Sequence, residues 1–409
     1  MNSENPIGII ELGNVNIKCL IFNIKDNNDS EILSTSITSS DGFHNGTVVN
    51  LAKATKAIRF CIGAAEKHAK VLLKKINVVF EEPEFLSTKF SKHKKINGSK
   101  IQKDDIDFLL KEAKKQLILN YKRQSIIHIF NHNYIVDGKA FIEEPIGVFA
   151  DSLSHEMTFI TLPKNNLKNI NQIFIDCDIE IERLISNTFA LGVKLLNNKE
   201  LKFGSILVDI GFEKISLGLF KNLALIHSMT LPMGINHITK DISKVCSLGM
   251  DESSIIRDNI DFSFQDNQII FDKNNYLKNT YFINSSYRKI SKSLILNVVK
   301  ARLDEIFEML KKQIIVPEFK LNSGIGFLLT GGGSHLINIE KYCTNFFGPN
   351  AKNIKESKNE IEKDLEKNFA SCLGALKIIK DGWETEAIPE TMSKSIKKMD
   401  FLTKFFRRG

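Results

Sequence analysis

Apolar and polar positions follow the same pattern twice along the chain, and this pattern predicts an α/β fold with two related halves. Residues 9–22 and residues 207–220 each read as an apolar strand, an acidic residue, a glycine turn and a second apolar strand. At one constant offset the acidic residues and the glycines coincide, Glu11 with Asp209 and Gly13 with Gly211. The shared register favours an internal duplication over two unrelated hairpins.

Longer stretches with apolar residues three and four positions apart predict helices. They cover residues 50–70, 103–119, 165–175, 180–196, 238–259 and 287–313. A short apolar run at 76–80 predicts a strand, which Glu82 and Pro83 end. A helix and several strands then interrupt the first half, and they predict an inserted module over 84–160.

These elements divide the chain into predicted parts. The first subdomain comprises residues 1–83 and 161–197, and the inserted module at 84–160 lies between these two stretches. The second subdomain comprises residues 198–238 and 318–382, and a small subdomain at 239–317 lies between them. A linker at 383–394 and a C-terminal segment at 395–409 follow. The linker is predicted because its residues are polar and include a proline.

Composition narrows the classes of function. With 43% hydrophobic and 25% charged residues in 409 positions, the chain is ordinary for a globular protein of two large domains. Its six cysteines form no C-x-x-C pair, which argues against a zinc site and a disulfide framework, so we expect no metal site. No stretch approaches the ~18 apolar residues of a membrane span. The net charge of +8 concentrates in the C-terminal segment, which leaves nucleic-acid binding with little support.

Residues 395–409 are predicted to form an amphipathic helix on a membrane surface. Its apolar face comprises Ile396, Met399, Leu402, Phe405 and Phe406, and its basic face comprises Lys397, Lys404, Arg407 and Arg408. Basic side chains suit both an anionic lipid surface and a helix C-terminus. The alternatives are a frayed basic tail and a helix packed on the protein itself.

Three glycine turns carry the candidate chemistry. A glycine after an apolar strand lets backbone N–H groups approach a phosphate, because no Cβ stands between them. Acidic residues at the strand ends can hold Mg²⁺ through water. The turns at Gly13 and Gly211, with a third at residues 331–333, therefore predict an actin-type nucleotide site. A triple glycine alone is equally typical of an ordinary turn between a strand and a helix, without a ligand.

Several segments together resemble the FtsA family of actin-like cell division proteins over nearly the whole chain. They are IELGNVNIKCLIF (10–22), HNYIVDGKAFIEEPIGVFA (132–150), GSILVDIG (204–211), LPMGINHITKDIS (231–243), VVKARLDEI (298–306), LLTGGGS (328–334) and the amphipathic tail. The resemblance implies a duplicated actin-like, ribonuclease H-like α/β fold with two halves around a nucleotide cleft. The module at 84–160 would be the subdomain that ordinary actins lack.

The resemblance also implies a structural protein, without catalytic residues, that binds ATP with Mg²⁺ and self-associates into filaments. It would anchor the C-terminal tail of FtsZ to anionic lipids at the cytoplasmic face of the inner membrane, at the division site, and recruit other division proteins. The nucleotide-contacting residues would be Gly13, Asn14, Asp209, Gly211, Glu252, Gly331, Gly332 and Gly333. The FtsZ tail would bind the subdomain at 239–317, beside Arg288, Lys289 and Lys292.

The second phosphate loop departs from the family pattern. The family usually reads D-I-G-G-G-T-T-D, whereas residues 209–216 read DIGFEKIS. Hydrolysis needs donors aimed at the transferring phosphoryl group and a cation held in place. We therefore expect ATP hydrolysis to be very slow or absent. The competing hypothesis is a cleft that binds no nucleotide. Two other functions stay open: an FtsA-like platform of type IV pilus assembly, which needs no membrane helix, and an actin-fold small-molecule kinase, against which the altered loop argues.

Overall fold

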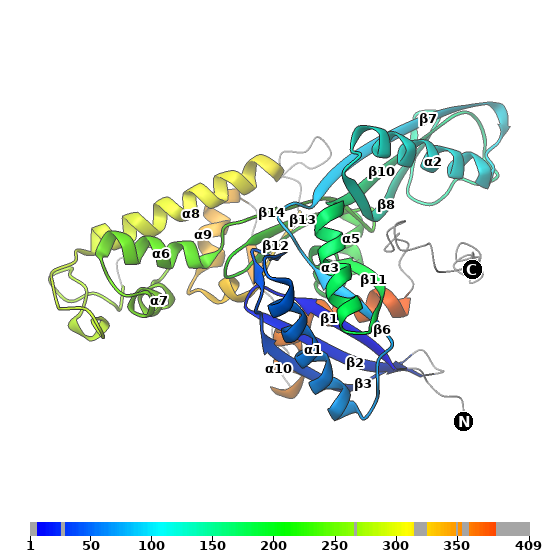
Figure 1. Ribbon diagram of the computed structural model, residues 1–409. Helices are drawn as coiled ribbons and strands as arrows, with labels where there is room; N and C mark the ends of the chain where they lie inside the picture. Colours follow the sequence, from blue (N-terminus) through cyan, green and yellow to red (C-terminus); the bar gives the residue numbers. More distant parts are fainter. Residues whose placement is uncertain are drawn as a thin grey trace. The chain divides into compact units, whose positions relative to one another are not determined.

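The computed structural model describes residues 6–25, 29–265, 268–314, 325–348, 351–353 and 360–381 (Figure 1). The chain divides into two units, which are described separately below. Unit 1 comprises residues 1–202, 220–228 and 357–409, and unit 2 comprises residues 203–219 and 229–356. The predicted linker at 383–394 and the predicted amphipathic helix at 395–409 lie outside the described residues.

A five-stranded sheet in the order β11-β6-β1-β2-β3 forms the centre of unit 1. Its strands are β1 (Ile7–Leu12), β2 (Asn16–Ile24), β3 (Ser30–Ser39), β6 (Lys75–Phe80) and β11 (Glu180–Ser186). β1 runs antiparallel to β2 and parallel to β6, which is parallel to β11. The neighbouring residues Ile9 and Ile10 point to opposite faces and are both fully buried, so both faces of the sheet are covered.

Helices cover this sheet. They are α1 (Leu51–Ala69), α3 (Lys164–Asp176), α4 (Asn187–Leu195) and α10 (Glu360–Asp381). The short helix α5 (Asn198–Phe203) follows α4, and a small hairpin pairs β4 (Phe43–His44) with β5 (Thr47–Val48). α1 packs on β2, β3 and α3, whereas α10 packs on β1 and α4. α1 begins where the side chain of Asn50 accepts a hydrogen bond from the Lys53 N–H, as an N-cap does.

The inserted module is a four-stranded sheet in the order β7-β10-β8-β9, with one helix packed against it. Its elements are β7 (Leu86–Lys100), α2 (Lys103–Asn120), β8 (Gln124–Val136), β9 (Lys139–Phe141) and β10 (Phe149–Pro163). Alternate residues of the strands join α2 in two apolar clusters, one around Leu109 and Leu153 and the other around Leu117 and Phe159. Asp105 starts α2, because its carboxylate accepts from the Gln102 N–H at 2.7 Å.

A second five-stranded sheet, in the order β14-β13-β12-β15-β16, forms the centre of unit 2; residues 220–228, which include the end of β13 and the start of β14, are counted with unit 1. The strands are β12 (Ser205–Ile210), β13 (Ile215–Lys221), β14 (Ala224–Leu231), β15 (Gly326–Thr330) and β16 (Ala351–Asn353); the helices are α6 (Ile235–Cys246), α7 (Met250–Asp258), α8 (Lys292–Ile314) and α9 (Ile339–Phe347), with 3₁₀ turns at Asn279–Tyr281 and Gly332–His335. α8 packs on α6, and Arg302 joins them through two hydrogen bonds to Asp241, at 2.5 and 3.0 Å.

The two sheets have the same strand order, which confirms the predicted duplication. The order β3-β2-β1-β6-β11 in unit 1 corresponds to β14-β13-β12-β15-β16 in unit 2. In both sheets the central strand makes a parallel pair on one side, β1 with β6 and β12 with β15. The repeated strand–glycine–strand pattern therefore marks equivalent elements of two equivalent sheets.

Three predicted helices were partly wrong. Residues 180–196 are the strand β11 followed by α4, since β6 offers backbone partners to residues 180–186 and Ser186 then caps α4. Residues 238–259 belong to two helices, because Ser247 adopts a left-handed conformation with φ of 48° and ends α6. The third predicted helix, 287–313, begins only at Lys292.

The last helix, α10, belongs to unit 1 and not to the second subdomain predicted at 198–238 and 318–382. Gly374 lets the backbone of α10 lie against the Ala190 carbonyl of α4, where a Cβ would overlap with that oxygen. Lys194 and Glu366 pair across the same two helices at 2.9 Å. The sequence does not distinguish these possibilities, because the apolar face of α10 suits either sheet.

Within the described ranges, every helix is too short or too polar to cross a bilayer.

Two histidines of the inserted module are buried in the uncharged form. His128 accepts a hydrogen bond from the Ser186 N–H at 2.9 Å, and burial, with a smaller effect of the Arg183 charge, lowers its pKa to about 3. His155 stacks on Tyr134 with ring centroids 4.4 Å apart. Burial, with smaller effects of His132 and Lys103, lowers the pKa of His155 to about 3.

We therefore predict that unit 1 loses stability as the pH falls. An unfolded histidine takes up a proton near its ordinary pKa of 6.5, whereas these two in the fold do so only near 3, so acid favours unfolding through this whole window. His155→Phe keeps the ring contact and should flatten the pH dependence, as measured by urea unfolding followed by circular dichroism. The same change at the exposed His68 should leave the pH dependence as it was, and an equal slope in all three proteins would contradict the prediction.

Candidate nucleotide site

The two predicted phosphate turns have the same backbone geometry. In unit 2 the Gly211 N–H donates to the Lys214 carbonyl at 3.0 Å, and a Cβ on Gly211 would stand 2.7 Å from that oxygen. In unit 1 a Cβ on Gly13 would overlap with the carbonyl oxygen of Asn16, at the equivalent position. Both glycines are therefore required by a tight turn between the two strands, whether or not a phosphate binds there.

In unit 2 the ends of two parallel strands bring Asp209 and Gly331 together. Asp209 lies opposite Thr330 in the β12–β15 pair, and Gly331 follows directly. The backbone of Gly331 has φ of 82° and ψ of 170°, a region that is essentially restricted to glycine. A Cβ at Gly331 would overlap with the Asp209 Oδ1, so this glycine lets the carboxylate lie directly against the turn.

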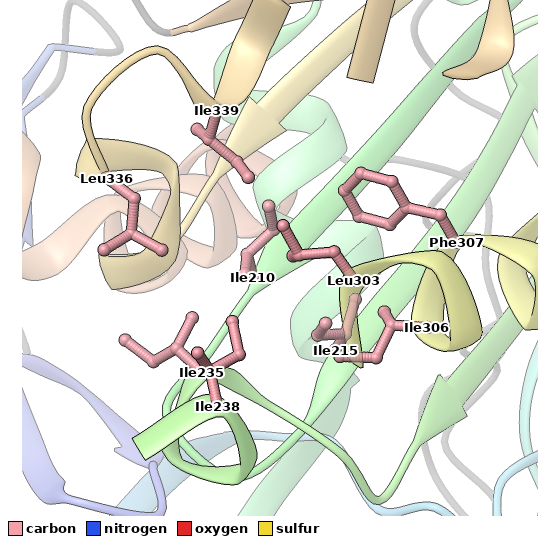
Figure 2. A pocket seen from close by; sticks show the side chains of 9 residues that line it. All are labelled: Ile210, Ile215, Ile235, Ile238, Leu303, Ile306, Phe307, Leu336 and Ile339. Atoms are coloured by element: carbon pink, nitrogen blue, oxygen red, sulfur yellow. The ribbon is translucent and has the colours of Figure 1, made fainter. Parts of the chain in front are cut away.

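The other two glycines of this turn differ in their surroundings. A Cβ on Gly333 would overlap with the side chain of Ile210 and approach that of Ile235 to 2.7 Å. Figure 2 shows both isoleucines in the apolar pocket beside this turn, which has a volume of about 10 Å³ and room for a single water at most. At Gly332 a Cβ would meet no described atom within 4 Å, so among the three this position alone has open space above it.

The second phosphate loop is closed by the start of α6. The Ile235 and Asn236 N–H groups donate to the carbonyls of Gly211 and Phe212, at 3.1 and 2.8 Å, and the Asn236 side chain donates to Glu213 at 3.2 Å. Free N–H groups at a helix start are the usual donors to a phosphate. Here the loop itself uses them, and Glu213 adds a negative charge.

Glu252 has a structural role in unit 2. Its Oε1 accepts from the N–H groups of Ile283, Asn284 and Ser285 at 2.7–2.8 Å, and its Oε2 accepts from the Gly249 N–H and the Ser285 hydroxyl. Burial would raise the pKa of this carboxyl, but these hydrogen bonds outweigh it and lower the pKa to about 2. The five donors fill the lone pairs of the carboxylate, so it has no acceptor left for the nucleotide contact that the resemblance implied.

In unit 1 the first turn carries a paired carboxylate. Glu11 accepts from the Ser371 hydroxyl of α10 at 2.5 Å and forms an ion pair with Lys18 at 3.3 Å. The buried Oδ1 of Asn14 accepts no hydrogen bond from the described residues. The turn at Gly13 and Asn14 is therefore held in place by the last helix of the unit.

Two further carboxylates, Glu81 and Glu82, lie at this edge and were not predicted as site residues from the sequence. They follow β6, whose last residue Phe80 pairs with Leu12 of β1, so they lie at the same sheet edge as the Gly13 turn. Glu81 accepts from the Ser186 hydroxyl and the Thr188 N–H, both at 2.9 Å, and caps α4. The sequence contained a signal for these two carboxylates, because they directly follow an apolar strand. Gly13 and Gly211 also come shortly after apolar strands.

The predicted partner-binding cluster lies at residues 288–292. Arg288 donates to the carbonyls of Cys246 and Ser247, and so caps the end of α6. The Lys289 ammonium lies over the Tyr276 ring at 5.6 Å, and Lys292 is the first residue of α8. Arg288 therefore holds unit 2 together, which makes Lys289 the better position at which to test binding.

No three or more His, Cys, Asp or Glu side chains of the described residues gather as a metal site. Carboxylates at two sheet edges, Glu11 in unit 1 and Asp209 in unit 2, are ligands of the kind that Mg²⁺ takes through water. The membrane-binding residues predicted between 396 and 408 lie outside the described residues.

Two family models match the chain. The model described as the SHS2 domain inserted in FtsA matches residues 85–161, and the model of the cell division protein FtsA matches residues 206–374. Together they cover more than half of the sequence.

Relatives and solved structures agree with these models. The chain is 24% identical to the cell division protein FtsA of Buchnera aphidicola from Schizaphis graminum, over 100% of this chain and 97% of that protein. It is 24% identical to FtsA of Neisseria meningitidis, over 84% of this chain and 82% of that protein. Among solved structures it is similar to a PilM–PilN type IV pilus biogenesis complex, with 13% identity and a TM-score of 0.63 over 91% of this chain and 98% of that one. It is also similar to a Spiroplasma citri MreB bound to ADP, with 12% identity and a TM-score of 0.53 over 92% of this chain and 98% of that one. These structures show that the fold is actin-like.

The geometry of the third turn predicts very different losses of stability when alanine replaces the adjacent glycines 331 and 332. Gly331→Ala should lower the free energy of unfolding by about 3 kcal/mol, because its backbone conformation excludes a Cβ and the carboxylate of Asp209 fills the space. Gly332→Ala should change it by less than about 0.5 kcal/mol. Urea unfolding of both variants measures the difference, and equal losses would show that the turn is not held as described.

Proposed function

The chain belongs to the FtsA family of cell division proteins, and from that premise we propose that it polymerises on the cytoplasmic face of the inner membrane and anchors FtsZ there. The observation that carries the proposal is the inserted module. Its four strands and single helix coincide with the match to the domain inserted in FtsA, and the duplicated actin-like sheets surround it in sequence. Members of this family are structural actin-like proteins.

The membrane contact is assigned to residues 395–409. Their apolar face, from Ile396 to Phe406, would enter the lipid interface while the basic residues meet anionic headgroups, each worth ~1 kcal/mol. One short helix binds weakly, so filament formation would supply the avidity. The division site is the expected location, where other division proteins would be recruited.

The FtsZ tail is assigned to the small subdomain at 239–317. A tail peptide with acidic residues would pack its apolar face on this subdomain and pair with the basic cluster. The side chain of Lys289 reaches the surface beside α8, whereas Arg288 is used to cap α6. Lys289 and Lys292 are therefore the proposed contacts, with Arg288 in support.

ATP with Mg²⁺ is proposed as a structural ligand of the turns at Gly13–Asn14, Asp209–Gly211 and Gly331–Gly333. Asp209 would hold a cation through water, which would neutralise phosphate charge beside Glu213 of the same unit. Since α6 uses its first N–H groups on the loop carbonyls, few donors remain to stabilise a transferring phosphoryl group. Bound nucleotide stabilises the fold by mass action without turnover.

Two other functions are less well supported. The likeness to the PilM–PilN complex, at 13% identity, concerns the fold, whereas both family models are those of FtsA. A small-molecule kinase would need a phosphate clamp, and the closed second loop provides a poor one.

We predict that Glu213→Gln tightens ATP binding roughly fivefold, equivalent to about 1 kcal/mol, because it removes a negative charge near the phosphates and keeps the contact with Asn236. Calorimetric titration with ATP and Mg²⁺ measures this, with phosphate release very slow or absent in both proteins. The same charge change in Asp251→Asn, at the start of α7, should have no effect. Rapid phosphate release, or no heat at millimolar nucleotide, would refute the structural-ligand proposal.

We predict that the full chain carries an FtsZ tail peptide onto anionic vesicles. A chain ending at Ser393 should stay in the supernatant together with the peptide. Co-sedimentation measures this. Lys289→Glu should reduce recruitment of the peptide while the protein itself still sediments, because only the peptide contact is altered. Lys300→Glu, an exposed lysine of α8, is the matched control. Undiminished sedimentation of the truncated chain would exclude the membrane role of the tail.

A further inference from the structure

Unit 1 contains a cavity of about 710 Å³ beside the inserted module. Its walls come from β8, the segment after β9, α5, the turn between β13 and β14, and the last residue of α10. The lining residues are Phe130, Asn131, Tyr134, Ile142, Glu143, Glu144, Asn198, Lys202, Asn222, Leu223, Ala224 and Asp381. The volume is in the range of sites that enclose a ligand or a side-chain cluster.

The cavity offers aromatic and apolar contact, and one of its lining residues, Asn131, carries an acceptor that the described residues leave unsatisfied. Phe130 and Tyr134 are each 3% exposed, whereas Ile142 and Leu223 are 40% and 43% exposed. The buried Oδ1 of Asn131 accepts no hydrogen bond from the residues that the structure describes. An occupant with a flat apolar surface and one N–H donor would fit both features.

The turn at Asn222 and Leu223 is held in an unfavourable conformation beside this cavity. Both residues have positive φ, 52° and 62°, although neither is glycine. Their N–H groups donate to the carbonyls of Lys202 and Leu201 at 3.0 Å, and the Asn222 side chain donates to the His132 carbonyl at 2.9 Å. A leucine with left-handed backbone is uncommon, and here it keeps an apolar side chain at the cavity.

A residue of the same chain lies close enough in sequence to the cavity lining to occupy the cavity. Asp381 lines the cavity, and residues 382–409 follow it, outside the described residues. Trp383, the only tryptophan of the sequence, is two residues further on, so its Cα lies within about 7 Å of the Asp381 Cα. Its indole is large, flat and apolar, and carries one N–H that can only donate.

We propose that the indole of Trp383 occupies this cavity, against Tyr134 and Leu223 and with its N–H directed to Asn131, and so fastens the start of the predicted linker at 383–394 to the inserted module. Residue 395 then lies at most about 40 Å from the anchor. The docking does not depend on the proposed function, whereas its consequence, a short tether for the membrane tail, does.

The fluorescence of the single tryptophan tests this in the full chain without any added probe. The emission maximum should lie to the blue of that of the urea-unfolded protein, and iodide should quench it poorly. Leu223→Gly should shift the emission to the red and increase quenching, because it removes one wall of the cavity. Since glycine adopts positive φ without strain, the same variant should be at least as stable as the parent, which separates lost docking from unfolding.

Leu72→Asp, at a leucine that is 81% exposed and absent from the cavity lining, is the control and should leave the emission unchanged. Emission of the parent equal to that of the unfolded chain overturns the proposal and leaves the cavity to another occupant. Blue-shifted emission that Leu223→Gly does not alter overturns it too, since Trp383 would then be buried elsewhere. A blue shift that disappears on dilution would mean docking into a second copy, which also contradicts docking within one chain.

Discussion

The fold depends on how closely the backbone can approach itself where each central strand ends. At Gly13 and at Gly211 the chain turns back so tightly that the carbonyl of the residue three positions later occupies the place of a Cβ. The next strand can then pair antiparallel with the first and start a five-stranded sheet. At Gly331 the same kind of approach brings the carboxylate of Asp209 against the end of the neighbouring strand. One backbone constraint thus builds both sheets and places the acidic residues at their edges.

The electrostatics of those edges explain why a nucleotide here would be a structural ligand. Glu81 and Glu82, beside the Glu11–Lys18 ion pair in unit 1, and Asp209 with Glu213 in unit 2 place carboxylates at both edges, and a cation would offset their repulsion of a triphosphate. The first N–H groups of α6, which would otherwise stabilise anionic oxygens, are paired with the loop carbonyls. Phosphoryl transfer needs donors that are free when charge develops. The first N–H groups of α6 are therefore not free to donate to a transferring phosphoryl group.

Unit 1 combines the end of the chain with the inserted module. α10 crosses α4 at Gly374, supplies Ser371 to Glu11, and ends at Asp381 beside the module. The same helix therefore contacts the first nucleotide turn and leads into the C-terminal segment. The membrane tail proposed above would be joined to the actin-like sheet of unit 1 through this one helix, which ends at a cavity.

The sequence alone determined the duplication, the inserted module and the family, because these depend on local patterns: strand, acid, glycine, strand, repeated at a constant offset. It also located Gly13, Gly211 and the turn at 331–333. Only the tertiary structure decided what those residues contact. Glu252 supports a loop 31–33 positions away, Arg288 caps a helix that ended at Ser247, and α10 joins the first unit. Each depends on the approach of segments distant in sequence, and a carboxylate, guanidinium or apolar helix face carries no mark of which distant backbone it will meet.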